Sequence, residues 1–272
     1  MRFKKWNIGT PAERDVALLR SAGYPYLLST VLAARGVTTA EAAAEALERD
    51  RSLSMSPMLM RDMDRAVDIL REKISEGKKI RVIGDYDIDG VNATYILLEG
   101  LERLGAEVDS DIPDRIRDGY GLNMELVERA YREGVDTVLT CDNGIAATEE
   151  IACGKRLGMT MIVTDHHEVP YVETDGEKVY QLPPGDAVID PKRADCGYPF
   201  KGLCGAAVAY KLMEALYEAS GRDSEELDDL IENVAIATVG DVMELTDENR
   251  IFVREGLAMM GRSRNLGLNA LM

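Results

Sequence analysis

The chain has 272 residues, of which 32 are Lys or Arg and 49 are Asp or Glu, so its formal net charge is −17. This negative charge disfavours anionic membrane surfaces and non-specific adhesion to DNA, and it excludes a generic basic nucleic-acid module. Hydrophobic residues make up 46% of the sequence, the usual fraction for a globular protein, and the length fits one large α/β domain with or without a small appendage.

The sequence contains no recognisable targeting segment. No apolar stretch approaches the roughly 20 residues that cross a bilayer, and Met1 to Trp6 lead into a polar segment instead of the apolar core of a signal peptide. We therefore expect a cytoplasmic protein without a membrane partner. The Cys residues form no C-x-x-C pair and lie far from any zinc-binding His, so we expect reduced, mostly buried thiols. They are Cys141, Cys153, Cys196 and Cys204.

Residues 1–75 are predicted to form a helical N-terminal lead. Residues 39–47 combine a Thr cap with Ala-rich sequence, which favours a helix. In residues 63–74, apolar side chains fall on one face before Gly77 ends the helix. No motif indicates a role for residues 1–50.

From residue 78 onward, short apolar runs alternate with helical patterns, which is typical of βαβ units. We therefore expect an α/β domain whose parallel sheet has helices on both faces. Strands are predicted at 79–84, 137–141, 161–164 and 187–189, with a weaker candidate at 107–112. Helices are predicted at 91–104, 125–133, 148–157 and 206–219. Residues 234–239 fit a fifth strand or an Ala-rich helix equally well.

The predicted strands end alike, at an aspartate. The aspartates concerned are Asp85, Asp142, Asp165 and Asp190, and Asp241 follows residues 234–239. Ligands of open parallel sheets bind outside the carboxyl ends of the strands, so these carboxylates should meet at one edge. Like charges so close together persist only when protons or cations compensate them. The alternative for any single aspartate is that it caps the helix that follows.

Residues 85–90, Asp-Tyr-Asp-Ile-Asp-Gly, place three carboxylates directly after a predicted strand. The run resembles the first half of a calcium-binding EF-hand loop. That interpretation fails because Ile96 stands where the loop requires a bidentate Glu, and because a strand precedes it. We predict instead a strand-to-helix loop in which Gly90 allows a tight turn.

The two histidines of the chain, His166 and His167, are adjacent and directly follow Asp165. Imidazole together with several carboxylates favours a divalent transition ion, Mn²⁺ most naturally, since Mg²⁺ is a poorer nitrogen binder. The alternative is a capped helix start with two histidines whose hydrogen bonds are satisfied within the fold.

These motifs together resemble those of the DHH phosphoesterases. The matching segments are residues 85–90, Asp142-Asn143-Gly144, Asp165-His166-His167 and Asp241. The details are similar to the RecJ-type branch, the single-stranded-DNA-specific exonucleases, with further matches at residues 112–115, 119–123, 203–212 and 247–250. The likeness runs through most of residues 50–260, and several ordered motifs in register make it specific.

The resemblance implies two Mn²⁺ ions, with Mg²⁺ as a possible substitute. The implied ligands are Asp85, Asp87, Asp89, Asp142, His166 and Asp241. Asp87 and Asp89 would each hold one side of the pair and Asp142 would bridge it, while Asp85 is a ligand or a supporting group. His167 would contact the scissile phosphate, and Asp165 would orient His166 by a hydrogen bond. Two ions would activate water for in-line displacement, so no protein nucleophile is required.

Three further residues are candidates for DNA contacts. Arg115 could form a forked contact to a phosphate, or an ion pair with Asp111 or Asp114. Tyr120 could stack on a base or serve only in packing. Gly205, at the start of a predicted helix, could receive a phosphate on its backbone N–H or permit close packing.

Exonuclease-type members of this family continue through a second substrate-binding domain and commonly an OB-fold. We interpret residues 76–260 as the DHH phosphoesterase domain and residues 261–272 as the start of a connecting helix to a missing C-terminal domain. The chain alone should then bind Mn²⁺ but degrade DNA weakly or not at all, which agrees with its lack of a basic run. The resemblance implies 5′ to 3′ digestion of single-stranded DNA in repair or recombination, with repair partners unknown.

Three alternatives remain open at this stage. A DHH phosphodiesterase could act on short oligonucleotides, cyclic dinucleotides or pyrophosphate, although those relatives more often begin with an N-P-D-x-D motif. A catalytically inactive replication-scaffold relative would retain the fold but lose ligands, and no expected ligand is missing here. A flavodoxin-like or nucleotide-binding module would require a Gly-rich phosphate loop, which residues 83–85 do not provide.

Overall fold

The computed structural model of the chain describes residues 9–48, 50–117, 119–174 and 176–271. The chain divides into two compact units, residues 1–54 and 55–272. This division lies at Ser54 and Met55, not near residue 75 as predicted. The reason is that residues 63–75 pack their apolar face into the core of the second unit.

The first unit is helical, as predicted. Its elements are α1 (Glu13–Ser21), α2 (Tyr26–Ala34), α3 (Ala40–Glu48) and η1 (Arg51–Leu53). The Thr39 hydroxyl accepts the N–H of Ala42 at 3.1 Å, which satisfies one donor at the start of α3. A small core of its own holds the unit together, formed by Val16, Leu19, Leu32, Ala33 and Ala43.

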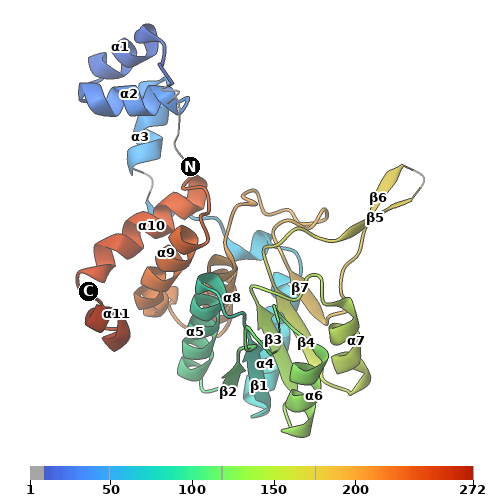
Figure 1. Cartoon of the computed structure of the whole chain (residues 1–272). Helices are drawn as coiled ribbons and strands as arrows, with labels where there is room; N and C mark the ends of the chain where they lie inside the picture. Colours follow the sequence, from blue (N-terminus) through green and yellow to red (C-terminus); the bar gives the residue numbers. More distant parts are fainter. Residues whose placement is uncertain (1–8, 49, 118, 175, 272) are drawn as a thin grey trace. The chain divides into compact units, whose positions relative to one another are not determined.

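The second unit is built on a sheet that, within the described residues, has five parallel strands in the order β2-β1-β3-β4-β7 (Figure 1). The strands are β1 (Lys79–Ile83), β2 (Glu107–Asp111), β3 (Thr137–Cys141), β4 (Thr160–Thr164) and β7 (Ala187–Ile189). The chain adds strands on one side of β1 and then on the other. The strand order therefore reverses between β1 and β3, and such a switch point is where ligands of open parallel sheets bind.

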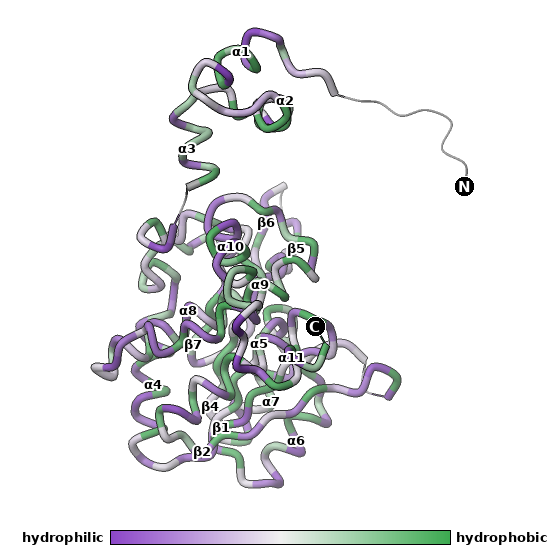
Figure 2. The backbone as a smooth tube through the Cα atoms, turned by 90° about the vertical axis from the view of Figure 1, so that its left-hand side faces the viewer, coloured by the Kyte–Doolittle hydropathy of each residue, from purple (hydrophilic) through white to green (hydrophobic). Residues whose placement is uncertain are grey.

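Helices cover both faces of the sheet, because the side chains of each buried strand alternate between two cores. Ile80 and Val82 face a core shared with α4 (Met63–Ser75), α5 (Ile88–Arg103) and α8 (Gly205–Ala219). Ile83 faces the opposite core, shared with α6 (Met124–Arg132) and α7 (Thr148–Arg156). Figure 2 shows that hydrophobic and hydrophilic stretches alternate along the chain.

A further helical layer packs on α5 and α8. It contains η3 (Ser224–Leu230), α9 (Ile231–Gly240) and α10 (Asp247–Met260). The short elements η2 (Pro57–Leu59) and α11 (Leu266–Leu271) complete the unit. Residues 234–239 are therefore helical, the second of the two alternatives. Val234, Ala235 and Ala237 are buried in α9, because neighbouring helices surround it.

A hairpin that we did not predict follows β4. Its strands are β5 (Tyr171–Thr174) and β6 (Glu177–Tyr180), which pair in antiparallel fashion, and all of their residues are exposed. The signal was present in the sequence, because an Asp-Gly pair stands between two short runs that contain Tyr, Val and Thr.

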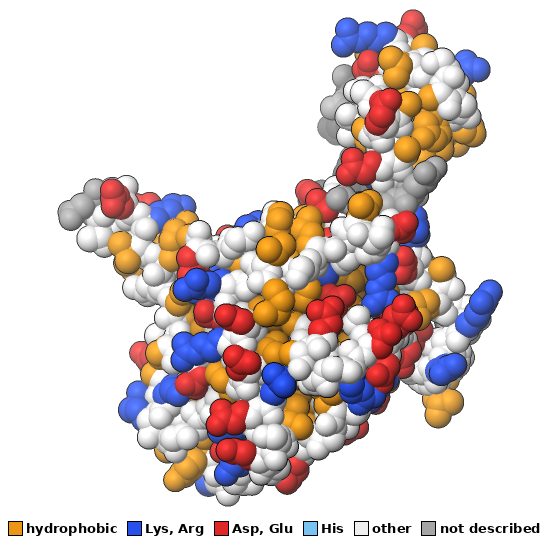
Figure 3. Space-filling view, turned by 180° about the vertical axis from the view of Figure 1, so that it is seen from behind, with side chains coloured by type: hydrophobic (Ala, Val, Ile, Leu, Met, Phe, Trp, Pro, Cys, Tyr) orange, Lys and Arg blue, Asp and Glu red, His pale blue; other side chains and the backbone are white. Residues whose placement is uncertain are grey.

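The surface carries charges of both signs. On the face seen in Figure 3, acidic and basic side chains are interspersed with hydrophobic ones. Cys141, Cys153, Cys196 and Cys204 are free thiols, and Cys153 alone among them is not buried. In the part of the chain that the structure describes, none of the helices is both long and apolar enough to cross a membrane.

Candidate metal centre

Asp85 and Asp87 occupy the loop between β1 and α5. Asp85 is buried, and its Oδ1 accepts the N–H of Tyr86 at 2.6 Å, whereas its Oδ2 has no hydrogen-bond partner. The Oδ1 of Asp87 accepts the N–H groups of Asp89 at 3.0 Å and Gly90 at 2.9 Å, so Asp87 caps α5. The capping alternative therefore holds for Asp87, although its second carboxylate oxygen is not used by the cap.

Gly90 allows the close backbone approach of the strand-to-helix turn, and it does so without a positive φ. A Cβ at this position would lie 2.6 Å from the backbone N and O of Asp85, and Gly90 is not among the residues with positive φ. Gly90 thus lets the first turn of α5 pack directly against the backbone of Asp85.

Asp89 lies in the first turn of α5 and is held by the start of α8. Its Oδ2 accepts the N–H of Gly205 and its Oδ1 that of Ala206, both at 2.7 Å. A helix N-terminus stabilises an anion through its free N–H groups and its dipole. The prediction that Gly205 receives a substrate phosphate is therefore wrong, because its N–H already binds the carboxylate of Asp89.

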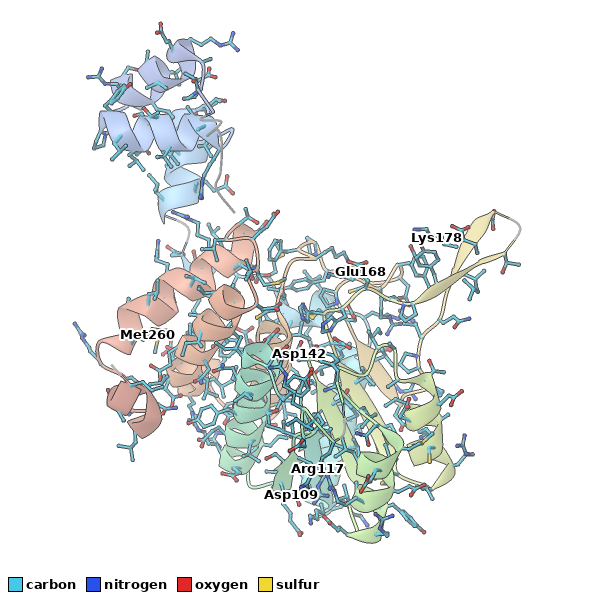
Figure 4. The ribbon with its side chains drawn as sticks, viewed as in Figure 1. Asp109, Arg117, Asp142, Glu168, Lys178 and Met260 are labelled. Carbon is cyan, nitrogen blue, oxygen red and sulfur yellow. The ribbon has the colours of Figure 1, made fainter. Side chains whose placement is uncertain are left out.

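Asp142 directly follows β3 (Figure 4). It is buried, its φ is 59°, and neither carboxylate oxygen accepts a hydrogen bond. Gly205 permits this placement, since a Cβ there would lie 2.6 Å from the Cβ of Asp142. Backbone strain combined with an unsatisfied buried carboxylate is typical of a functional site.

His166 follows the end of β4 and lies close to three of the candidate ligands. Its Nε2 lies 3.0 Å from Asp142 Oδ1, 3.5 Å from Asp89 Oδ2 and 3.9 Å from Asp241 Oδ2. Among the described residues, two sets of three offer ligand atoms within 4.8 Å of one another: Asp142, His166 and His167, and Asp89, His166 and Asp241.

Asp241 reaches the centre from the carboxyl end of α9, not from a strand. Its side chain is 34% exposed, so it lies at the rim of the centre that solvent reaches. Asp85 and Asp87 belong to neither set of three. Asp87 is nevertheless close enough for its charge to raise the pKa of both Asp142 and Asp241.

Asp165 orients His167, not His166 as predicted. Its Oδ1 lies 2.7 Å from Nδ1 of the His167 ring, and its contact with His166 is to the backbone N–H, also at 2.7 Å. The other carboxylate oxygen accepts the N–H of Ile145 at 2.9 Å. The reason is geometric, because the ring of His166 is directed at Asp142 and Asp89, while the ring of His167 turns back over Asp165.

The electrostatics of the centre favour a bound cation. Burial, followed by the charges of Asp89 and Asp87, raises the pKa of Asp142 to about 11. Burial also raises the pKa of Asp89 to about 6, against the two N–H donors at the start of α8. The pKa of His166 is lowered to about 4, first by burial and then by His167. The neutral imidazole that results is the form that binds metals.

The residues present fit a divalent transition metal. The unsatisfied oxygens of Asp85 and Asp142 are buried acceptors that lack a donor, and a cation would supply the missing interaction. Several carboxylates with one imidazole form a donor set suited to Mn²⁺ and, less well, to Mg²⁺.

Aromatic residues line the rim beside His167. The hydroxyl of Tyr120 lies 3.4 Å from His167 Nε2, and its ring meets that of Tyr86 edge to face at 5.8 Å. The guanidinium of Arg115 lies over the Tyr86 ring, 5.3 Å from its centre. Asp111, one of the two ion-pair partners considered for Arg115, is bound to Arg129 instead.

Two residues at the centre stand within the sequence motifs, but the sequence indicated no role for them. Tyr86 supports Arg115 and Tyr120, and its position between two motif aspartates was the available signal. The side-chain amide of Asn143 donates to the carbonyls of Ile83 at 3.2 Å and Cys141 at 2.9 Å, which joins β1 to β3 at the switch point. Its place directly after Asp142 could have suggested a supporting role.

A family model described as the N-terminal domain of the DHH family matches residues 79–238, which is more than half of the chain and includes Asp85 to Asp89, Asp142, Asp165 and both histidines. The chain belongs to the DHH family. Asp241 and the whole of α10 lie beyond the matched residues.

DHH-family relatives similar to the chain are named single-stranded-DNA-specific exonuclease RecJ. The Bacillus subtilis protein is 38% identical over 98% of this chain and 32% of its own length. The Salmonella typhimurium protein is 35% identical over 96% of this chain and 45% of its own length. The chain thus spans less than half of the length of these relatives.

Solved structures of RecJ proteins also match. One described as RecJ in complex with Mn²⁺ from Thermus thermophilus has a TM-score of 0.75 and 31% identity, covering 97% of this chain and 36% of that one. Another, described as exonuclease RecJ bound to manganese, has a TM-score of 0.69 and 36% identity, covering 80% and 53%. The predicted fold class, a parallel-sheet α/β domain of the DHH type, is confirmed.

Proposed function

We propose that this DHH-family chain carries the metal centre of an enzyme that hydrolyses phosphodiester bonds of single-stranded DNA from the 5′ end. The observation that carries the proposal is the convergence of Asp142, Asp89 and Asp241 on the Nε2 of His166 within 3.9 Å. The names of the relatives supply the substrate class. A role in DNA repair or recombination and a cytoplasmic location belong to the same proposal.

We assign two Mn²⁺ ions to the centre. Asp87, Asp89, Asp142, His166 and Asp241 would hold them, with Asp85 as a ligand or a support. Support comes from the unsatisfied oxygens of Asp142 and Asp85 and from solved RecJ structures described with Mn²⁺ or Mg²⁺. Two divalent ions would activate water and compensate the charge of an in-line displacement.

His167 is suited to bind a phosphate oxygen and to deliver a proton. The Asp165 carboxylate holds its Nδ1 at 2.7 Å and raises the pKa of the imidazole. With Nδ1–H donated to Asp165, the Nε2 of protonated His167 carries the other proton, and Nε2 is directed toward Tyr120 at the rim. When His167 is protonated, a phosphate at the rim would meet an Nε2–H donor beside the proposed metal ligands.

The rim supplies contacts for DNA. Tyr120 is 52% exposed and can stack on a base. Arg115 is exposed above the Tyr86 ring, where its guanidinium can form two parallel hydrogen bonds to a phosphate. A cavity of about 370 Å³ borders His167 and Tyr120 and offers room for one nucleotide.

The test is a single-turnover assay with the chain in excess over a 5′-labelled single strand. Because the chain spans less than half the length of its curated relatives, we expect slow release of mononucleotides. Release should require Mn²⁺ and be abolished in Asp142→Asn. A duplex of the same sequence should not be cleaved.

Other outcomes of this assay separate the parts of the proposal. Preferential cleavage of di- or trinucleotides would contradict the single-stranded-DNA substrate and favour the phosphodiesterase alternative. Mn²⁺ binding without cleavage of any strand, even at high excess of protein, would contradict the expected slow release of mononucleotides by this chain but not its metal centre. Rapid processive digestion would support the nuclease activity and contradict only the expected low rate.

A further inference from the structure

The first turn of α10 contains two consecutive polar residues, Glu248 and Asn249, that are both 0% exposed. They belong to the segment 247–250, and neither offers an atom to the two metal-ligand sets described above. Burial of polar side chains is costly unless hydrogen bonds compensate it, so their partners indicate what they do.

Asn249 joins two loops that lead to metal ligands. Its side-chain amide donates to the carbonyl of Gly202 at 2.7 Å and to that of Glu244 at 3.0 Å. Gly202 lies three residues before Gly205, whose N–H binds the carboxylate of Asp89. Glu244 lies three residues after Asp241, in the turn between α9 and α10.

Glu248 fixes the helix that presents this amide. It accepts the hydroxyl of Tyr198 at 2.5 Å and the N–H of Met55 at 2.9 Å, and it lies 3.2 Å from the ammonium of Lys211, which is also 0% exposed. Tyr198 and Gly202 both lie in the segment between β7 and α8. The loop before α8 is therefore held at two points by neighbouring residues of one helical turn.

We propose that Asn249 is a positioning residue of the metal centre. One planar amide, through its two N–H groups, sets the distance between the α8 start, which holds Asp89, and the turn that follows Asp241. Both ligands lie against His166, so a shift of either loop changes the coordination distances. This inference rests on the proposed function, because it requires that Asp89 and Asp241 bind the same metal pair.

The experiment measures Mn²⁺ affinity by calorimetry in the unaltered chain and in three variants. Asn249→Ala removes both donors, and Asn249→Ser retains a hydroxyl that can serve at most one of the two carbonyls. Tyr217→Phe is the matched control, because the buried Tyr217 hydroxyl also donates to a backbone carbonyl, that of Gly100 at 3.2 Å, away from the ligands. Neither Asn249 variant introduces a charge that would itself alter cation binding.

We expect Mn²⁺ affinity to fall at least about 10-fold in Asn249→Ala, the effect typical of residues that orient metal ligands. Asn249→Ser should be intermediate, and Tyr217→Phe should stay within about twofold, since it removes one hydrogen bond remote from the ligands. The folded fraction is measured by circular dichroism in each sample, and a stabilising osmolyte is added to all samples if the alanine variant is partly unfolded.

Two results would overturn the inference, and they are distinguishable. If the unaltered chain binds Mn²⁺ and folded Asn249→Ala and Asn249→Ser bind it equally well, Asn249 is only structural and the proposed function stands. If the unaltered chain binds no Mn²⁺ at all, the metal centre and this inference fail together.

Discussion

Asp142 combines two unfavourable features in one buried residue. Its φ of 59° lies in the left-handed region, and its carboxylate oxygens lack hydrogen-bond donors. A left-handed conformation costs about 1–3 kcal/mol for a residue with a side chain, and burying a carboxyl group without hydrogen-bond partners adds to that cost. Residues with such a cost persist where function requires them, which is the expectation for a metal ligand.

Asp142→Asn should separate stability from metal binding. Asn tolerates the left-handed conformation and has nearly the same shape, but it removes the carboxylate that repels Asp89. We expect the metal-free chain to gain about 1 kcal/mol or more in free energy of unfolding near neutral pH, because the raised pKa of Asp142 makes folding take up a proton and Asn requires none. Mn²⁺ affinity should fall at least about 100-fold, since a metal ligand is lost. Urea denaturation and calorimetry measure the two effects.

Asp68→Asn is the control for this substitution, because Asp68 is an exposed carboxylate on α4. It should change neither quantity. Unaltered Mn²⁺ affinity and stoichiometry in Asp142→Asn would refute the central place given to Asp142.

Asp190 predicts a pH dependence of stability. It is buried after β7, and burial raises its pKa to about 8, although the N–H of Lys192 bonded to its Oδ1 opposes this. The folded chain therefore retains a proton that the unfolded chain loses near pH 4. Its contribution to stability is present at low pH and is lost as the pH rises toward 8, at up to about 1.4 kcal/mol per pH unit.

Asp190→Asn should remove that dependence, because Asn resembles the protonated acid. We expect the unaltered chain to lose free energy of unfolding relative to Asp190→Asn between pH 6 and 8 in urea titrations with chelator present. A difference between the two proteins that stays constant over this range would show that Asp190 is ionised in the fold.

At the scale of elements, the centre is made from the ends of strands and helices. Asp85, Asp142 and Asp165 follow β1, β3 and β4, while Asp241 ends α9. The start of α8 closes the centre by binding Asp89, and Gly205 allows Asp142 to lie against it. The position of a single helix end therefore controls two of the proposed metal ligands.

Gly205→Ala tests that closure. The added Cβ would lie 2.6 Å from the Cβ and 2.9 Å from the Cα of Asp142, so either α8 or Asp142 must move. We expect a loss of about 1–3 kcal/mol of stability, as for overpacked sites. Mn²⁺ affinity should fall at least about 10-fold, because both Asp89 and Asp142 are displaced. Thermal unfolding and calorimetry report the two losses.

The matched variant is Gly261→Ala, at a glycine with open space around its Cβ position and a φ of −65°. It should leave both quantities unchanged. Equal Mn²⁺ affinity in the two glycine variants would mean that the α8 start does not position the ligands.

The sequence predicted those elements whose signals are local. Apolar runs ending in aspartate predicted four strands correctly, because strands buried on both faces are continuously apolar. What it did not predict depends on tertiary neighbours. Nothing in residues 234–239 distinguishes a strand from a helix until α5, α8 and α10 surround them. Tertiary packing also determines which histidine ring contacts Asp165 and which carboxylate binds the N–H of Gly205. The first depends on the position of the end of β4, and the second on the position of the start of α8.

At the scale of the whole molecule, residues 1–54 and 55–272 each have a core of their own. The ligands of the proposed centre all lie in the second unit. We therefore expect residues 54–272, prepared alone, to fold and to bind Mn²⁺ within about twofold of the full chain, because no ligand is removed. Ser54 is retained so that Met55 keeps the peptide N–H that Glu248 accepts. Calorimetry measures the Mn²⁺ affinity of this fragment. A fragment that is unfolded or binds no Mn²⁺ would show that the first unit is required for folding or for the metal centre.

The most direct test is anomalous diffraction at the manganese edge from crystals of the chain soaked in Mn²⁺. Two peaks are predicted, both within coordinating distance of Asp142, with His166, Asp89 and Asp241 around them. Mn²⁺ peaks located elsewhere, or none near the Nε2 of His166 at saturating Mn²⁺, would contradict the assignment of this sheet edge as the metal centre.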